Sequence, residues 1–223
     1  MFAALAAHVV APRNLGGRSL HNRYVANALP ALADLMLVDR CLEGEQAAAR
    51  ELFRAHQGRV HSTLYRVLGG NRDMDDLLQE TFIQVFRSLR SFRGEARLAT
   101  WIDRIAARVA YRYLARRKAE VPTVVLEDAA DVGVEAAERA LAREGVRRLY
   151  AALGELGAAS RLAFALHEID GRSVAEVARC VGSSVTATKL RIWRARRALD
   201  RLAAGDAVLA EFLGQRQARG ERE

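Results

Sequence analysis

Two consecutive helical patterns between residues 73 and 118 constrain the fold of this chain more than any other stretch. The first, DMDDLLQETFIQVFRSLRSF, begins with acidic residues, and Asp73 stands in an N-cap position before it. Its apolar residues recur at helical spacing: Leu78, Phe82, Val85 and Leu89. The second, RGEARLATWIDRIAARVAYRYLARRK, carries seven basic residues from Arg97 to Lys118 and one acidic residue, Asp103. We therefore expect two helices joined by a loop, each with one side facing a core.

The second pattern separates apolar from basic residues along one predicted helix. The apolar side carries Trp101, Ile105 and Val109, and the neighbouring side carries Arg104, Arg108, Arg112 and Arg116. Because like charges four residues apart repel, an external anion is expected to compensate them, and a phosphate backbone supplies anions at regular intervals. The aromatic residues that could stack on unpaired bases are Phe92, Trp101, Tyr111 and Tyr113. Core packing is the alternative for Tyr113, and it explains Trp101 at least as well.

A second pair of helical patterns, GRSVAEVARCVGSSVTATKLRIWRARRALDRL, has the form of a helix-turn-helix. Ser173 and Glu176 have capping-box spacing, Gly182 suits the end of the first helix, and Ser183 or Ser184 suits the start of the second. The apolar positions of the first helix are Val174, Val177, Ala178 and Val181; the second has an inward stripe of Val185, Thr188, Ile192, Ala195 and Leu199. A short turn between two such helices delivers the second into the major groove of DNA.

The outward face of that second helix carries the side chains that we expect to meet DNA. They are Thr186, Lys189, Leu190, Trp193 and Arg196 or Arg197. Six basic residues and one acidic residue lie between Lys189 and Arg201. Basic side chains near the N-terminal end can reach guanine edges, and those further along can reach phosphates. An exposed Trp193 side chain is unfavourable unless a partner covers it. The alternative is an indole packed against the preceding helix.

Composition points to a globular protein with a polyanionic partner. Of the 223 residues, 51% are hydrophobic and the net charge is +8, which favours nucleic acid before a membrane surface. Cys41 and Cys180 lack metal or disulfide spacing and are interpreted as small apolar fillers of helices in a reducing cytoplasm. No apolar run is long enough to cross a bilayer, so a soluble, cytoplasmic protein is expected. We find no catalytic constellation, and we predict no cofactor, metal or small-molecule substrate.

The predicted fold class is all-α, with two small helical domains joined by an acidic linker. The predicted segments are a poorly ordered extension over 1–30, a first domain over 31–118, the linker over 119–139, a helix-turn-helix domain over 140–204 and a tail over 205–223. From Ala119 to Glu138 there are six acids and no base. The tail contains a short apolar patch, Val208, Leu209, Phe212 and Leu213, that can fold back on the second domain.

The run DDLLQETFIQVFRSLRSFRGEARLATWIDRIAARVAYRYLARRK resembles region two of bacterial RNA polymerase sigma factors of the extracytoplasmic-function (ECF) subfamily. The resemblance implies contacts with the polymerase by Asp75, Asp76, Gln79 and Glu80. It implies contacts with the minus-ten promoter element by Arg93, Gly94, Thr100, Trp101, Arg104, Arg108 and Arg112. Complementation of the helix dipole is a simpler explanation of the acidic residues, and the two explanations remain open.

The helix-turn-helix segment resembles sigma region four, which binds the minus-thirty-five element. The residues implied to bind DNA there are Thr186, Lys189, Leu190, Trp193, Arg194 and Arg197, with Arg191 and Arg196 nearby on backbone or partner surfaces. Thr186 stands where the family usually has Gly, and Leu190 where it usually has a small polar residue, so the base preference is expected to differ. The linker is either a solubilising spacer or, as the resemblance implies, a segment that threads through the polymerase.

The resulting hypothesis is a sigma factor, not an enzyme, that binds core RNA polymerase and directs promoter recognition, DNA melting and transcription initiation. The resemblance also implies an anti-sigma factor as a partner. The alternative is a stand-alone helix-turn-helix regulator whose N-terminal half dimerises or senses a signal. The basic, aromatic second helix of that half favours the first hypothesis, because a sensing module does not need it. A nucleic-acid enzyme with a divalent metal is a third and weaker possibility.

Overall fold

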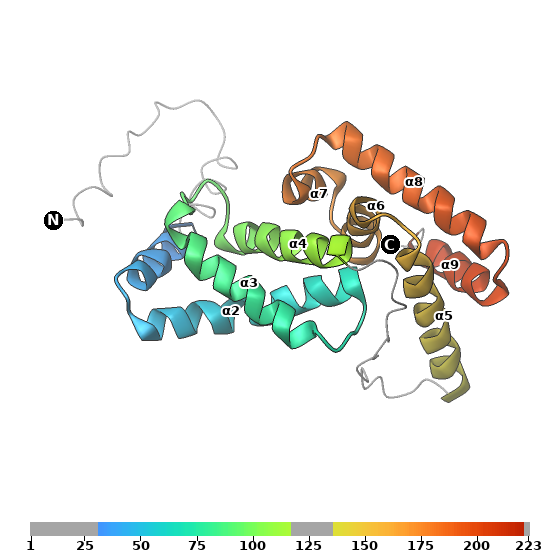
Figure 1. Ribbon diagram of the computed structural model, residues 1–223, viewed down its shortest axis with the longest axis horizontal. Coiled ribbons are helices and arrows are strands. Elements are labelled where there is room, and N and C mark those ends of the chain that lie inside the picture. The colour runs from blue at the N-terminus through green and yellow to red at the C-terminus, as the bar shows by residue number, and fades with distance from the viewer. Residues whose placement is uncertain (1–30, 117–135, 221–223) are drawn as a thin grey trace, which may run out of the picture.

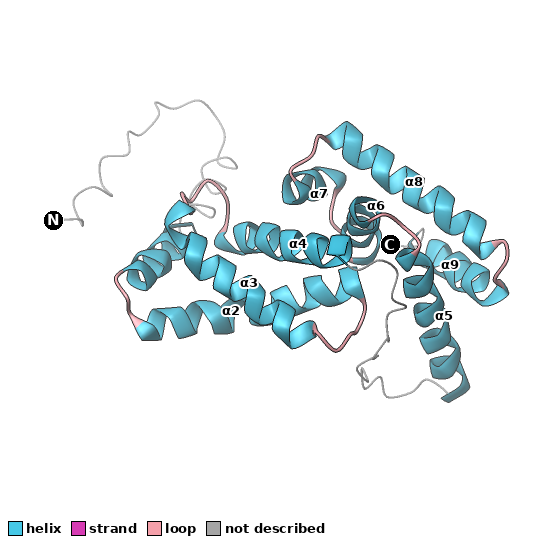
Figure 2. Ribbon diagram, in the orientation of Figure 1, coloured by secondary structure: helices cyan, strands magenta, loops and turns pink. Residues whose placement is uncertain are grey.

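A computed structural model describes residues 31–116 and 136–220, which are almost entirely helical (Figures 1 and 2). The described residues contain no strand, which confirms the predicted all-α class. The predicted extension over 1–30 and most of the predicted acidic linker lie outside the described residues. Among those residues, no helix is long and apolar enough to span a membrane.

The first half of the chain is built from three long helices that pack against one another. Residues 31–42 form a preceding helix, after which come α2 (Gln46–Leu68), α3 (Met74–Ser88), a short 3₁₀ turn η2 (Leu89–Ser91) and α4 (Leu98–Arg116). The predicted pair of helices around a loop is therefore confirmed as α3 and α4. The predicted stripe of α3 does face the core, with Phe82, Val85 and Leu89 buried and Leu78 packed against them.

Asp73 is the N-cap residue of α3, as predicted, but its side chain makes no capping hydrogen bond. The Asp73 carboxylate instead accepts a hydrogen bond from the Tyr113 hydroxyl of α4 at 2.9 Å. The backbone N–H of Asp73 is satisfied by the side-chain oxygen of Asn71 at 2.9 Å. The residue that begins α3 thus also ties α3 to α4, and Tyr113 is held within the fold.

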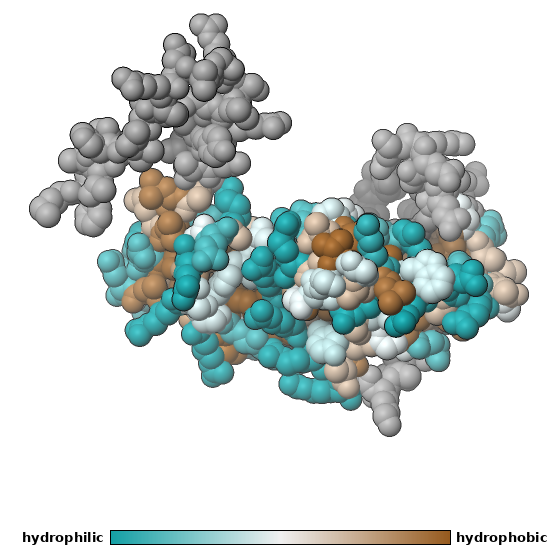
Figure 3. All heavy atoms as spheres, turned by 90° about the horizontal axis from the view of Figure 1, so that it is seen from above, coloured by the Kyte–Doolittle hydropathy of each residue, from teal (hydrophilic) through white to brown (hydrophobic). Residues whose placement is uncertain are grey.

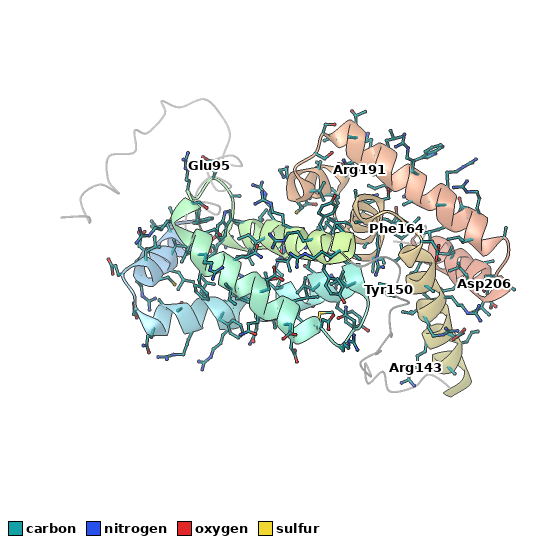
Figure 4. The ribbon with its side chains drawn as sticks, viewed as in Figure 1. Glu95, Arg143, Tyr150, Phe164, Arg191 and Asp206 are labelled. Atoms are coloured by element: carbon teal, nitrogen blue, oxygen red, sulfur yellow. The ribbon has the colours of Figure 1, made fainter. Side chains whose placement is uncertain are left out.

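The second half contains the predicted helix-turn-helix together with flanking helices. Its elements are α5 (Ala136–Gly154), α6 (Ala158–Phe164), a π-helical turn η3 (Ala165–Ile169), α7 (Val174–Val181), α8 (Val185–Ala203) and α9 (Ala207–Gly220). The helix α5 begins inside the stretch predicted as linker. The apolar patch of the tail lies on α9 and packs against α5 and α8, with Leu209 buried. Asp206, which Figure 4 labels and which lies just before α9, accepts a hydrogen bond from Arg148 of α5 at 2.9 Å.

The turn between α7 and α8 is built largely as the sequence predicts. Ser173 and Glu176 form a reciprocal capping box, and Gly182 ends α7 in the left-handed conformation at φ 64°. Ser184, rather than Ser183, caps α8 by accepting from the N–H of Ala187 at 3.1 Å. The inward stripe of α8 is buried except for Val185, which is 44% exposed. The prediction that Val185 is buried is wrong, because Val185 is the first residue of α8 and lies exposed at the end of the stripe.

The two halves share one apolar core rather than standing apart. Buried side chains of α2, α3 and α4 form a single cluster with Leu162 and Leu166 near α6, Val177 and Cys180 of α7, and Ile192 of α8. The helix α4 packs directly against α6 and α7, which in turn pack against α8. In Figure 1, α6 and α7 accordingly lie between α4 and α8.

Candidate nucleic-acid and polymerase interface

The acidic start of α3 is open to solvent. Asp75, Asp76 and Gln79 are exposed on its first turns, whereas Glu80 is half-buried. Glu80 accepts a hydrogen bond from Arg112 of α4 at 3.2 Å and another from Gln84 at 2.9 Å. Of these residues predicted to contact the polymerase, Glu80 is thus engaged within the fold. Asp75 and Asp76 form no ion pair among the described residues, so their charge is available to a partner as well as to the helix dipole.

Two apolar side chains continue the acidic face of α3, and sequence reasoning missed them. Ile83 is 43% exposed and Phe86 is 37% exposed. Both follow Asp76 and Gln79 at helical spacing, so all four lie along one side of the helix. An apolar residue that falls outside the buried stripe of an amphipathic helix was the signal available in the sequence.

An aromatic pair at the two sides of the loop between α3 and α4 belongs largely to the core. Phe92 is buried, and its ring meets Trp101 edge to face with 5.6 Å between ring centroids. Trp101 is half-buried, which agrees with the core-packing alternative for that residue. The expectation that Phe92 stacks on bases is wrong in this arrangement because the core covers its ring. Tyr111 is 43% exposed and is the aromatic residue on α4 most open to solvent.

The remaining predicted positions of this region lie around the same loop. Arg93 is exposed, and Thr100 is half-buried in the first turn of α4. Gly94 has φ +72°, and a Cβ atom there would come within 3.2 Å of the Leu35 side chain. A side chain at Gly94 is therefore disfavoured both by the backbone conformation and by Leu35. The glycine lets the loop turn closely over the helix formed by residues 31–42.

The row of arginines on α4 is only partly neutralised by the protein. Arg112 pairs with Glu80, whereas Arg104, Arg108 and Arg116 have no ion pair among the described residues. The Nε atoms of Arg104 and Arg112 are buried and have no hydrogen-bond partner in the described parts of the chain. Arg108 and Arg116 are exposed. Most of the positive charge that the sequence places on this helix is therefore left for an external anion.

The outward face of α8 presents an exposed indole among basic side chains. Trp193 is 56% exposed and Leu190 is 43% exposed, so the alternative of an indole tucked against the preceding helix is wrong. The guanidinium of Arg197 lies over the Trp193 ring at 5.7 Å from its centroid. The neighbouring positions Thr186, Lys189 and Arg194 are also exposed.

Arg196 belongs to a different surface of α8. Its guanidinium donates to the Glu168 carboxylate of η3 at 2.8 and 2.5 Å, which holds α8 against the helices behind it. The choice left open between Arg196 and Arg197 on the outward face is thereby resolved in favour of Arg197.

Seen from above, on the side where α8 lies in Figure 1, apolar side chains are scattered among hydrophilic ones (Figure 3).

No metal site is evident in the described parts of the chain, since no group of three His, Cys, Asp or Glu residues is arranged to hold an ion there. Cys41 is half-buried and Cys180 is buried, and both are free thiols in helices. Burial raises the pKa of the Cys180 thiol, and the nearby charge of Arg172 partly opposes this effect. Burial also lowers the pKa of His56.

Comparisons with known proteins cover both halves. Residues 52–120 match the family model for sigma-70 region 2, and residues 146–199 match that for sigma-70 region 4. The chain is 32% identical over 179 residues to the ECF RNA polymerase sigma-E factor of Haemophilus influenzae, covering 76% of this chain and 94% of that protein. The sigma-E factor of Escherichia coli K12 is also 32% identical over 179 residues, with 76% and 93% covered.

Solved structures show the same architecture. CnrH, in complex with the cytosolic domain of CnrY, matches with a TM-score of 0.54 and 29% identity, covering 78% of this chain and 99% of CnrH. The sigma factor RpoE of Bartonella quintana, in complex with the anti-sigma factor NepR, shares the fold with a TM-score of 0.52 and 19% identity, covering 70% and 97%. Two family models and relatives matched over almost their whole length therefore agree: the chain belongs to the ECF sigma factors of the sigma-70 family.

Proposed function

We propose that this chain binds core RNA polymerase, directs it to a two-element promoter and helps to melt the downstream element. The observation that carries this proposal is the presence, in one chain, of two helices with exposed, largely unneutralised basic faces, α4 and α8. Each helix has its opposite face buried in a core, so its basic side chains are held in fixed rows. Two such rows suit two separate segments of DNA.

The minus-thirty-five element is assigned to α8 and the minus-ten element to α4 and the loop before it. On α8, the residues assigned to DNA are Thr186, Lys189, Leu190, Trp193, Arg194 and Arg197. On the minus-ten side they are Arg93, Gly94, Thr100, Trp101, Arg104, Arg108 and Arg112. The Trp193 indole with the Arg197 guanidinium over its ring forms a flat, cationic surface suited to bases or phosphates.

The polymerase is assigned to the exposed side of α3. Asp75, Asp76 and Gln79 supply charge and hydrogen bonds, and Ile83 and Phe86 supply apolar area one and two turns further along. Apolar side chains at the centre of a surface with a polar rim are typical of protein interfaces. Glu80 joins this surface to α4 through Arg112, so polymerase binding and the position of the α4 arginines are linked through one ion pair.

Further parts of the proposal follow from family membership. RNA synthesis belongs to the polymerase, the chain itself is not catalytic, and it acts in the cytoplasm. An anti-sigma factor is proposed as a third partner. We further propose that residues 31–118 and 140–204 are the two functional domains, with 119–139 as linker. Because α5 begins at Ala136 and α9 packs on it, the second domain extends a few residues before 140 and into the tail.

A gel-shift assay separates this function from that of a stand-alone regulator. A sigma factor of this kind is expected to shift promoter duplex strongly only when core polymerase is added, because one chain alone covers few phosphates. We expect the chain without polymerase to bind promoter and random duplex with similar, salt-sensitive affinity. Tight binding of one duplex sequence by the chain alone, unchanged on adding polymerase, would instead identify a stand-alone regulator.

A further inference from the structure

The loop between α3 and α4, residues 93–97, has little internal structure to hold its shape. Glu95 marks this loop in Figure 4. Among the described residues, no hydrogen bond between backbone groups involves residues 93–96. Arg93 and Glu95 are exposed, and Gly94 and Ala96 are half-buried. Because ordering a backbone costs conformational entropy, the observed conformation needs support from neighbouring elements.

One support is Asp34, on the helix formed by residues 31–42. The first hydrogen bond of α4 runs from the N–H of Trp101 to the carbonyl of Arg97 at 3.1 Å. Arg97 therefore takes the N-cap position, but its side chain has no oxygen that could accept from the first turn. Asp34 supplies that oxygen from another helix, because its Oδ2 accepts from the backbone N–H of Leu98 at 2.9 Å. Its negative charge also complements the positive end of the α4 dipole.

The same carboxylate oxygen also holds the last residue of the loop. Asp34 Oδ2 accepts a hydrogen bond from the Nε of Arg97 at 2.8 Å. The Asp34 side chain is 15% exposed, whereas the Arg97 side chain is 53% exposed. A largely covered carboxylate thus holds a guanidinium that stays open to solvent. One side chain thereby fixes both the end of the loop and the first turn of α4.

The helix formed by residues 31–42 also supports the middle of the loop, and it is itself anchored to the fold. Leu35 packs against the core, and its side chain lies where a Cβ atom at Gly94 would come within 3.2 Å of it. Val38, one turn further along, is buried in the same core. Near the far end, Arg40 pairs with Glu51 of α2 at 3.0 Å. The helix is therefore a fixed platform beside the loop.

We propose that Asp34 is a positioning residue for recognition of the minus-ten element. It holds the loop over 93–97 and the first turn of α4 in the conformation that presents Arg93 and Thr100 to DNA. This inference rests on the proposed function, because that function assigns the loop and α4 to the minus-ten element. Asp34 acts through its hydrogen bonds and does not touch DNA. Its pairing with Arg97 also offsets the repulsion that a free carboxylate beside the loop would exert on phosphates.

Amide hydrogen exchange measured by NMR tests the contact without DNA or polymerase. In the natural chain, the Leu98 N–H should exchange at least tenfold more slowly than in an unfolded peptide of the same sequence. In Asp34→Ala its exchange should be about tenfold faster than in the natural chain, because the acceptor is lost. Asp34→Asn keeps an acceptor oxygen, so exchange should stay within about threefold of the natural rate. An unprotected Leu98 N–H in the natural chain would overturn the contact.

Promoter opening by the reconstituted holoenzyme tests the positioning role. The probe is a duplex selected from a random-sequence library by holoenzyme with the natural chain, and permanganate detects its unpaired thymines. In Asp34→Ala the rate of opening should fall about tenfold, while affinity for core polymerase stays within about twofold. Asp34→Asn should recover most of the rate. The matched control is Asp39→Ala, exposed on the same helix, which should open the duplex at the natural rate. A natural rate of opening in Asp34→Ala would overturn the positioning role.

Repeating the selection with Asp34→Ala holoenzyme separates positioning from a general loss of stability. A loosened loop reads the minus-ten element poorly but leaves α8 unchanged. The base preference should therefore relax at the minus-ten element and persist at the minus-thirty-five element. Equal relaxation at both elements, or at neither, would contradict the positioning role. If holoenzyme with the natural chain opened no duplex, the proposed function itself would fail, whereas the exchange rates of Leu98 would still show whether Asp34 caps α4.

Discussion

Asp76→Lys combined with Glu80→Lys is expected to lower the affinity for core RNA polymerase by about 100-fold. Reversing two charges on the exposed side of α3 replaces attraction by repulsion, which costs several kcal/mol at a complementary interface. Asp76 has no ion pair among the described residues, and the Glu80 pair with Arg112 is about two-fifths exposed on each side. Breaking such a pair costs little stability. Fluorescence anisotropy of the labelled chain, titrated with polymerase, measures the change.

The matched control for this variant is Glu43→Lys. Glu43 is exposed in the turn before α2, in the same half of the chain but outside α3. A charge reversal there should leave polymerase affinity within about twofold of the natural chain. If the α3 variant kept full affinity and the native helical content, the assignment of this face to the polymerase would be wrong. An equal loss in both variants would point to a general effect of charge.

Lys189→Ala combined with Trp193→Ala is expected to reduce promoter-dependent transcription by about 100-fold while polymerase binding stays intact. A base contact by a basic side chain discriminates by roughly 1–3 kcal/mol, and an aromatic anchor in an interface contributes a similar or larger amount. Trp193 is 56% exposed, so its removal leaves no cavity in the core. In vitro transcription with reconstituted holoenzyme and a cognate promoter measures the effect.

Leu202→Ala serves as the control on the same helix. Leu202 is 38% exposed in the last turn of α8, beyond the residues assigned to DNA. Its truncation should change transcription less than twofold. Full promoter activity in the Lys189 and Trp193 double variant would contradict the assignment of the outward face of α8. Combined loss of transcription, polymerase binding and helicity would show that the variant had unfolded.

Local signals in the sequence predicted most of the secondary structure. Ser173, Glu176 and Gly182 define both ends of α7, because a capping box and a left-handed glycine depend only on neighbouring residues. The same reasoning located the start of α3 at Asp73. It did not predict the partner of the Asp73 carboxylate, which accepts a hydrogen bond from a hydroxyl 40 residues away instead of capping the helix. The prediction that Val185 is buried was wrong for a related reason, since its burial depends on what packs beyond the turn.

Contacts between the halves could not be predicted from the sequence. Nothing in the sequence around Arg161 indicates that its side chain is buried, because the carbonyls to which it donates belong to a helix more than 90 residues away. In the sequence, Asp103 is the one acidic residue of a basic helix. In the structure, its buried carboxylate pairs with arginines from both halves of the chain. Among candidate site residues, the exposure of Trp193 agrees with its predicted place on the outward face of α8, and its role at DNA stays a prediction. Ile83 and Phe86 lie outside the predicted apolar stripe of α3, and the sequence alone does not show that they stay exposed.

The most direct test of the central claim is competition for core RNA polymerase between the purified chain and a labelled housekeeping sigma factor, over a series of salt concentrations. We predict that the chain displaces the labelled factor, and that Asp76→Lys with Glu80→Lys does so about 100-fold less effectively. Part of the binding should weaken as salt rises, because charged residues of α3 contribute to it. Failure of the folded chain to compete at low salt would contradict the sigma-factor account and favour the stand-alone regulator.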